Sequence, residues 1–191
     1  MASPFFKVIP VRPVLRDQCE ITMRLYLHQV VTGPNHNQET MVPSSHPASF
    51  GMIVINDWPI YDGPDFNTST IVAHARGMHV QVDQVNNTWY TSMNIEFVDA
   101  RFLWRIIILK WYRFNGSKLQ VMGTTPETGE WAIVGGTGQL AMAYGTIQHN
   151  IVKNNPGIET TRQLDIHAFY STPQTQADVM TTTNTIGQQA E

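Results

Sequence analysis

The sequence predicts an all-β protein, and two observations carry that prediction. Charged residues make up only 14% of the 191 residues, well below the roughly 25% typical of soluble domains, and uncharged polar residues take their place. In addition, stretches of alternating apolar and polar residues are separated by turn signals at short intervals. No segment shows a convincing helical period. We therefore expect about eight or nine strands arranged as a sandwich or a barrel.

The first predicted strand is ITMRLYLHQVV, at 21–31, in which Ile21, Met23, Leu25, Leu27 and Val31 share one face. This period of two is typical of a strand with one buried side. The further predicted strands lie at 49–57, 70–82, 88–114 (two strands joined by a tight bend), 117–123, 145–152 and 161–171. Turn signals separate several of them: NG at 115–116, TTPETGEW at 124–131 and NNPG at 154–157.

The two ends of the chain differ in composition from its middle. Residues 1–19 are interrupted by prolines and predict an extended segment. Residues 172–191 are rich in Thr and Gln and have no core pattern, which is typical of a linker or a disordered tail. We therefore expect one β domain at 20–171, between an extended N-terminal segment and a C-terminal linker or tail.

The glycine-rich stretch AIVGGTGQLAMAYG, at 132–145, raises the question of a phosphate-binding loop. Such a loop needs a lysine and a following helix whose N-terminus faces the phosphates. This stretch contains no lysine and predicts no helix. We interpret the glycines as a sharp bend between strands. The alternation after them predicts a strand with Leu140, Met142 and Tyr144 on one face.

Composition excludes several classes of function. The net charge is −3 without a basic block, so we expect no nucleic-acid partner. No 18-residue apolar stretch and no signal-peptide core is found, so we expect no membrane partner and a cytoplasmic location, with any secretion by an unconventional route. Cys19 is the single cysteine, which excludes an intrachain disulfide. The seven histidines fall on different elements, so we expect no metal site, and no cofactor.

Several motifs, in the same order, resemble those of plant dirigent proteins. VGGTGQLAMAYG is similar to their VGGTGxFxMARG, SFGMIVINDWPIYDGPD to SFGxVxVxDDPLTxGPD, NGSKLQVMG to NGSTLxVLG, and LYLHQVV to FYFHDIL. The resemblance covers roughly residues 20–171. It implies an eight-stranded antiparallel β-barrel of the dirigent and allene-oxide-cyclase type, a homotrimer, and a pocket inside each barrel.

Dirigent proteins steer the coupling of phenoxy radicals without oxidising them, and carboxylates are thought to protonate a quinone methide in members that steer ring closure. The resemblance places Gln29 where the family has an acid and Tyr144 where it has an arginine. Trp89 stands at the tyrosine position, while Glu130 and Asp57 keep acidic positions. We expect these five residues to line the pocket as ligand-binding groups, with none of them catalytic.

An amide, carboxylates and aromatic rings can recognise the hydroxyls and C–H face of a sugar. The chain also resembles the dirigent part of grass proteins in which a C-terminal jacalin-related lectin domain follows. Our first hypothesis is a non-catalytic, carbohydrate-binding dirigent domain of a modular plant defence protein, and not an enzyme. The alternatives are a dirigent protein that steers stereoselective coupling or cyclisation of phenoxy radicals, and a trimerisation module whose pocket is vestigial.

Overall fold

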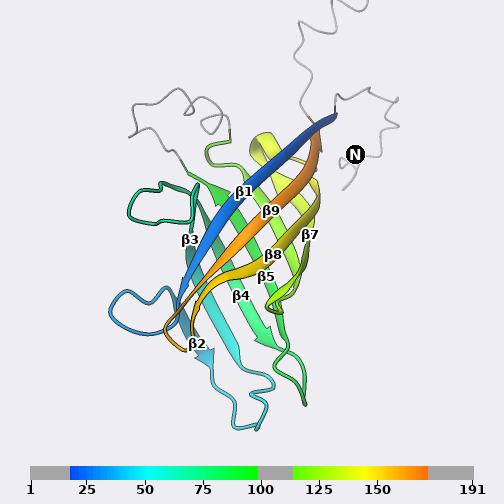
Figure 1. The fold of residues 1–191 in the computed structure, drawn as a ribbon. Helices are drawn as coiled ribbons and strands as arrows, with labels where there is room; N and C mark the ends of the chain where they lie inside the picture. The colour runs from blue at the N-terminus through cyan, green and yellow to red at the C-terminus, as the bar shows by residue number, and fades with distance from the viewer. Residues whose placement is uncertain (1–17, 99–113, 172–191) are drawn as a thin grey trace, which may run out of the picture.

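A computed structural model describes residues 18–98 and 114–171, which form a single antiparallel sheet (Figure 1). Its elements are β1 (Gln18–Val30), β2 (Gln38–Val42), β3 (Ile53–Tyr61), β4 (Ile71–Gln81), β5 (Trp89–Phe97), β6 (Lys118–Thr124), β7 (Thr128–Thr137), the 3₁₀ turn η1 (Gly138–Leu140), β8 (Tyr144–Asn155) and β9 (Glu159–Ser171). The strand order is β1-β9-β8-β7-β6-β5-β4-β3-β2, and β1 also pairs with β3. The second pairing of β1 closes eight strands into a barrel.

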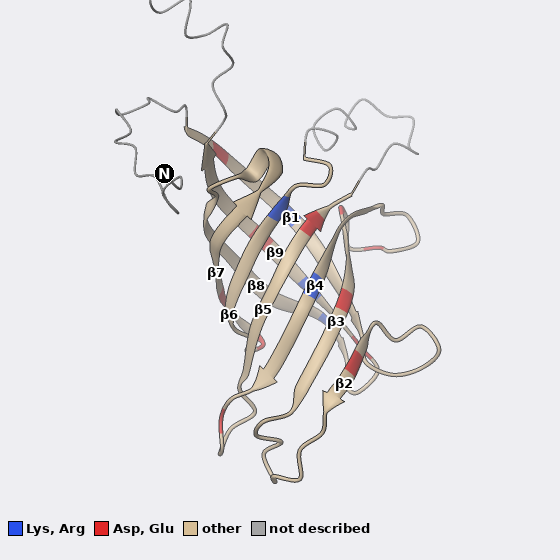
Figure 2. Ribbon diagram, turned by 180° about the vertical axis from the view of Figure 1, so that it is seen from behind, with Lys and Arg blue, Asp and Glu red and all other residues tan. Residues whose placement is uncertain are grey.

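The closed eight-stranded antiparallel barrel confirms the fold expected from the motifs. Alternation along each strand sends apolar side chains inward, as in β9, where Leu164, Ile166 and Ala168 are buried and the exposed His167 points outward. Few residues of β3 to β6 are charged (Figure 2). Closure pairs the strand edges with one another, so a wall with few charges presents little free edge to other chains.

The two ends of the barrel have different interiors. Leu140 of η1, Phe114 and Tyr170 fill one end with apolar atoms. All but one of the buried polar residues in the described ranges lie toward the other end, namely Asn56, His79, Gln81, Thr91, His149, Thr161 and Arg162, whereas Ser117 accepts a hydrogen bond from η1. The sequence therefore builds an apolar base and a polar mouth from the same strands.

The glycine-rich stretch forms the apolar base. β7 runs through Gly136, η1 follows, and β8 begins only at Tyr144, so the prediction of a strand over 140–144 is wrong. A Cβ atom on Gly136 would lie 2.1 Å from the backbone oxygen of Leu140, so only glycine lets η1 fold back against β7. Leu140 is fully buried, whereas Met142, at φ 61°, is 69% exposed.

Other strands differ in extent from the prediction. β3 continues through Pro59. On one side, β3 pairs with β2 before this residue and with β1 after it. The backbone N–H of Asp57 faces that side and donates to the Asn37 carbonyl. The nitrogen of Pro59 faces the same side, where the missing N–H removes no ladder bond.

β2 and β7 were not predicted. β7 begins at Thr128, inside the turn expected at 124–131, and runs through Gly135 and Gly136, which were interpreted as a bend. The second strand predicted within 88–114 falls largely on residues 99–113, which lie outside the described residues.

Candidate functional site

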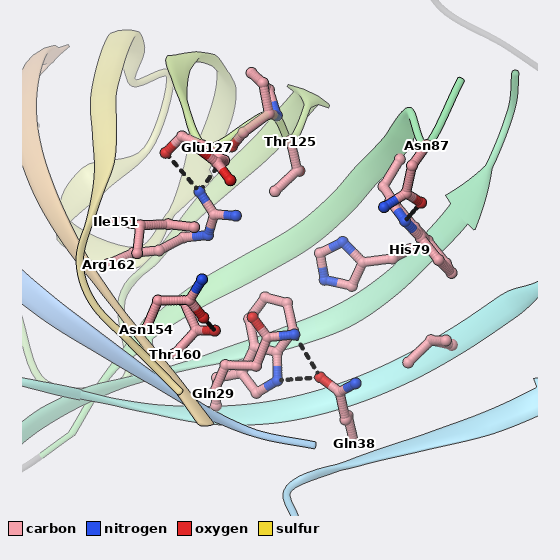
Figure 3. A pocket seen from close by; sticks show the side chains of 14 residues that line it. Gln29, Gln38, His79, Asn87, Thr125, Glu127, Ile151, Asn154, Thr160 and Arg162 are labelled. Atoms are coloured by element: carbon pink, nitrogen blue, oxygen red, sulfur yellow. Dashed lines mark hydrogen bonds between the residues drawn. The ribbon is translucent and has the colours of Figure 1, made fainter. Parts of the chain in front are cut away.

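The polar mouth of the barrel holds a cavity of about 320 Å³ (Figure 3). This volume lies at the lower end of the range for small-molecule sites. Its lining mixes amide, imidazole, guanidinium and indole groups with two aliphatic side chains. The lining residues are Gln29, Gln38, Val54, Trp58, His79, Asn87, Trp89, Thr125, Pro126, Glu127, Ile151, Asn154, Thr160 and Arg162.

Two glutamines and a tryptophan form one wall of the cavity. Gln29, near the end of β1, donates from Nε2 to Oε1 of Gln38 on β2 at 2.8 Å. The indole Nε1 of Trp58 donates to the same oxygen at 3.3 Å. Because an indole N–H can only donate, this contact fixes which end of the Gln38 amide is the oxygen. The wall is thus held in place by its own hydrogen bonds (Figure 3).

His79 projects from β4 into the cavity and is 5% exposed (Figure 3). Its ring stacks on Trp58 with centroids 4.4 Å apart, and its Nδ1 lies 2.6 Å from the hydroxyl of Thr91. Its Nε2 is buried without a hydrogen-bond partner. Burial, assisted by the positive charge of Arg162, lowers the pKa of His79 to about 4. The imidazole is therefore neutral at neutral pH and offers one unused nitrogen.

Arg162 enters the cavity from β9 and is 7% exposed. Its Nη1 donates to the backbone oxygens of Pro126 at 2.8 Å and Glu127 at 3.2 Å, and lies 3.2 Å from Nδ1 of His149. Its Nε is buried without a partner. Burial lowers the pKa of Arg162 to about 10, against an opposing effect of the Glu127 carboxylate. The guanidinium therefore stays charged at neutral pH.

A second buried histidine, His149, contacts the Arg162 guanidinium. His149 of β8 is 1% exposed and packs on Trp131 with ring centroids 4.1 Å apart. Burial and the charge of Arg162 lower the pKa of His149 to about 4. Its neutral Nδ1 can accept the hydrogen bond from the guanidinium. These contacts position the Arg162 guanidinium without neutralising its charge.

Gln29 and Trp89 lie where the sequence predicted them, at the cavity. Gln29 shares the inward face of Leu25 and Leu27. Trp89 begins β5, is half-buried, and donates from Nε1 to Oδ1 of Asn87 at 2.7 Å. The structure brings these two together at the mouth, and their role in binding a ligand stays a prediction.

Asp57 lies on the outer wall, so the prediction that it lines the pocket is wrong. Its neighbour Trp58 takes the inward position on β3, which turns Asp57 outward. The carboxylate accepts hydrogen bonds from His74 Nδ1 at 2.6 Å and Arg76 Nε at 3.0 Å. Partial burial acts to raise the pKa of Asp57, but these two hydrogen bonds outweigh it and hold the pKa below its ordinary value.

Glu130 and Tyr144 also lie on the outer wall, which corrects their predicted place. Trp131 takes the inward position next to Glu130, whose carboxylate accepts a hydrogen bond from Gln148. Tyr144 follows η1, which breaks the alternation assumed for 140–144, and its ring stacks on Phe169. Both side chains are exposed.

Sequence reasoning missed the two groups with the most unusual environments, His79 and Arg162. A signal for Arg162 was present, because it shares its strand face with Leu164 and Ile166. His79 likewise shares the inward face of Ala75 on β4. Within the described ranges, no group of three His, Cys, Asp or Glu side chains is placed to hold a metal ion. In the same ranges, no helix is long and apolar enough to cross a membrane.

Comparison with known families decides how this barrel is classified. Residues 20–169 match the family described as Dirigent-like protein. The chain belongs to the dirigent family. It is 27% identical to pterocarpan synthase 1 of Glycine max over 155 residues, which is 77% of this chain and 76% of that one. It is 29% identical to pterocarpan synthase 1 of Glycyrrhiza echinata over 134 residues, which is 66% of this chain and 64% of that one.

A solved structure of a pterocarpan synthase dirigent protein superimposes on this dirigent barrel with a TM-score of 0.74 at 24% identity. The match covers 87% of this chain and 99% of that one, and it shows the shared fold. The relatives are named as synthases, which overturns the prediction that this chain is not an enzyme. That prediction rested on the expected lack of oxidase and nucleotide chemistry and on the replacements at Gln29 and Tyr144. Tyr144 lies outside the cavity, while Arg162 places a guanidinium inside it.

Proposed function

We propose that this dirigent protein holds a small phenolic molecule in the cavity at the barrel mouth while the molecule closes a ring or couples to a second one. The conformation held in the cavity then determines which stereoisomer forms. One observation carries the proposal: a buried, charged guanidinium faces an aromatic-walled cavity with one nitrogen unused. The names of the pterocarpan synthase relatives favour ring closure among these reactions.

The walls suit a planar ring. The indoles of Trp58 and Trp89 and the side chain of Ile151 present flat or apolar surface, and His79 stacks on Trp58. Aromatic rings gain from such stacked or edge contacts beyond the area they bury. A cavity of about 320 Å³ accepts a small aromatic skeleton and little more. This favours one phenolic molecule over an extended glycan.

The polar groups suit an oxygen that carries or develops negative charge. Ring closure to a cyclic ether breaks a carbon–oxygen bond, expels that oxygen as water, and joins a phenol oxygen to the freed carbon. The leaving oxygen gains a proton and the phenol loses one, so neither an oxidant nor a reductant is consumed. Arg162 would hold a substrate oxygen that carries or develops negative charge, because a preorganised charge in a water-poor site stabilises such an oxygen more than water does. Glu127, at the rim, is the carboxylate available for proton transfer.

Stereoselectivity of the product tests the proposal. The full chain is incubated with coniferyl alcohol and a one-electron oxidant, and separately with an isoflavanol whose phenol and benzylic hydroxyl condense to a pterocarpan. We expect at least one product to be enriched in one enantiomer, measured by chiral chromatography. Arg162→Gln should return that product to the racemate, because it removes the charge that fixes the oxygen.

The matched control is Arg24→Gln, since Arg24 pairs with Asp165 on the outer wall at 2.6 Å, away from the cavity. This variant should keep the enantiomeric excess of the wild type. Racemic products from the wild type with both substrates would contradict the proposal. Binding of simple saccharides in the same preparation would then favour the carbohydrate hypothesis.

The homotrimer, the cytoplasmic location and the C-terminal jacalin-related lectin partner remain predictions from the sequence resemblance. Size measurement of the purified chain tests the first of these. The barrel offers outer-wall apolar side chains on β3, β4 and β6, namely Ile55, Met78 and Met122, that an assembly would cover.

A further inference from the structure

One edge of the Arg162 guanidinium is free. Within the described chain, its hydrogen bonds to Pro126 and Glu127 both leave from Nη1, which also contacts His149. Nε is buried without a partner. Nε and Nη2 form one side of the planar group, and two parallel N–H donors on that side match the two oxygens of a carboxylate. The protein thus uses one nitrogen to position the group, and no described residue bonds the Nε–Nη2 edge.

The charge of Arg162 is also uncompensated. The carboxylate that acts on it, Glu127, is exposed at the rim and forms no ion pair with the guanidinium among the described residues. The neighbouring histidines, His79 and His149, are neutral at neutral pH because their pKa values are lowered to about 4. A buried charge without a partner is costly, so a ligand that brings the opposite charge gains the most there.

The kind of anion follows from its ionisation at neutral pH. A phenol, with an ordinary pKa of about 10, stays neutral at pH 7 and leaves the guanidinium uncompensated, whereas a carboxyl group, with a pKa of about 4, is ionised. A planar skeleton attached to the carboxylate would extend from Arg162 toward His79 (Figure 3), whose ring stacks on Trp58 and whose Nε2 has no hydrogen-bond partner. That nitrogen can bond a second polar group of the ligand.

We propose that the substrates of this cavity are phenolic carboxylic acids, held by their carboxylate on the free edge of Arg162 with the ring against Trp58. The inference rests on the proposed function in taking the same cavity as the substrate site. It assigns the negative oxygen held by Arg162 to a carboxylate of the substrate, which stereoselective coupling or ring closure does not itself require.

A pair of ligands that differ only at one group tests the charge requirement. Ferulate and coniferyl alcohol share the methoxyphenol ring and the propenyl chain, and ferulate ends in a carboxylate where the other ends in a hydroxymethyl group. Titration of the full wild-type chain, followed by its tryptophan fluorescence or by calorimetry, should give a Kd for ferulate at least about ten-fold lower. Equal affinities, or tighter binding of coniferyl alcohol, would overturn the inference without using any variant.

Two variants then test whether Arg162 causes the tighter binding of ferulate. Arg162→Gln should raise the Kd of ferulate about ten-fold or more and leave that of coniferyl alcohol within about two-fold. Arg24→Gln, on the outer wall, should change neither. Because Arg162 also anchors the β6–β7 turn, circular dichroism and a thermal melt check that its variant folds. A ferulate preference that survives Arg162→Gln in a folded protein contradicts the assignment.

The two proposals fail in different ways. Enantiomeric enrichment from coniferyl alcohol without preferential binding of ferulate would support the proposed function. It would contradict the inference that the substrates are phenolic carboxylic acids. Ferulate preference with racemic products from every substrate, ferulate with an oxidant included, would remove the proposed function and leave an acid-binding cavity.

Discussion

At the residue scale, each tryptophan that follows an acidic residue takes the inward position. In both Asp57–Trp58 and Glu130–Trp131, the indole points into the barrel and the carboxylate points out. Neighbouring strand residues face opposite sides, and burying an indole is favourable where burying an unpaired carboxylate is costly. The buried titratable side chains that line the cavity are instead His79 and Arg162, which have apolar neighbours on their own strand faces.

The lowered pKa of His79 makes stability depend on pH. Between about 6.5 and about 4, the unfolded chain binds a proton at this residue that the folded chain does not. The free energy of unfolding should therefore fall as pH drops through this window and level off below it. His79→Gln should remove about 2 kcal/mol of the loss between pH 7.5 and 5, measured by urea unfolding at both values. An unchanged pH difference would show that His79 is not buried neutral, whatever the variant's absolute stability.

At the scale of elements, η1 closes the apolar end of the barrel, and it depends on a close approach of two backbone segments. Gly136 lies against the backbone oxygen of Leu140, and Gly138, at φ 65°, starts the turn. Leu140 then reaches the core beside Phe114 and Tyr170. The glycine-rich stretch is thus a structural plug at the end opposite the cavity.

Two adjacent glycines give a matched test of that plug. Gly136→Ala places Cβ 2.1 Å from a backbone oxygen, so η1 must move, and we expect a loss of at least about 1–3 kcal/mol in the free energy of unfolding. Gly135→Ala meets only the end of the Gln120 side chain, which is exposed and can rotate. Gly135→Ala should therefore lower the free energy of unfolding much less than Gly136→Ala. Chemical denaturation of both variants measures the difference, and equal losses would mean that η1 does not pack as described.

At the scale of the whole molecule, closure of the barrel rests on a short seam. β1 pairs with β9 along its whole length but with β3 through only two residue pairs, Tyr26 with Tyr61 and Leu27 with Ile60. The seam lies beside the cavity wall, because Trp58 precedes it on β3 and Gln29 follows it on β1. The buried side chains at the seam, Leu27 and Ile60, therefore stabilise the position of the cavity wall.

Two isoleucines of β3 test the contribution of the seam. Ile60 is fully buried, and Ile60→Ala should cost about 2–5 kcal/mol in the free energy of unfolding. Ile55 is 42% exposed on the outer wall, so Ile55→Ala should cost less than about 1 kcal/mol. Hydrogen exchange should further show earlier opening of β1 and β3 in the Ile60 variant. Uniform exchange across the barrel would contradict a weak seam.

The sequence by itself determined the strand alternation and most of the turns, because both depend on neighbours within a few residues. It also oriented Gln29 correctly through its shared face with Leu25 and Leu27. Matching motifs misplaced Asp57, Glu130 and Tyr144, since a motif gives a position and not a facing direction.

The tertiary structure alone decided which inward groups meet. Arg162 and His79 lie on β9 and β4, far apart in the sequence, and closure brings them to one cavity. Their unused nitrogens and lowered pKa values arise from burial, which depends on all the strands that surround them. Local sequence patterns carry no such information, because desolvation is a property of the closed barrel.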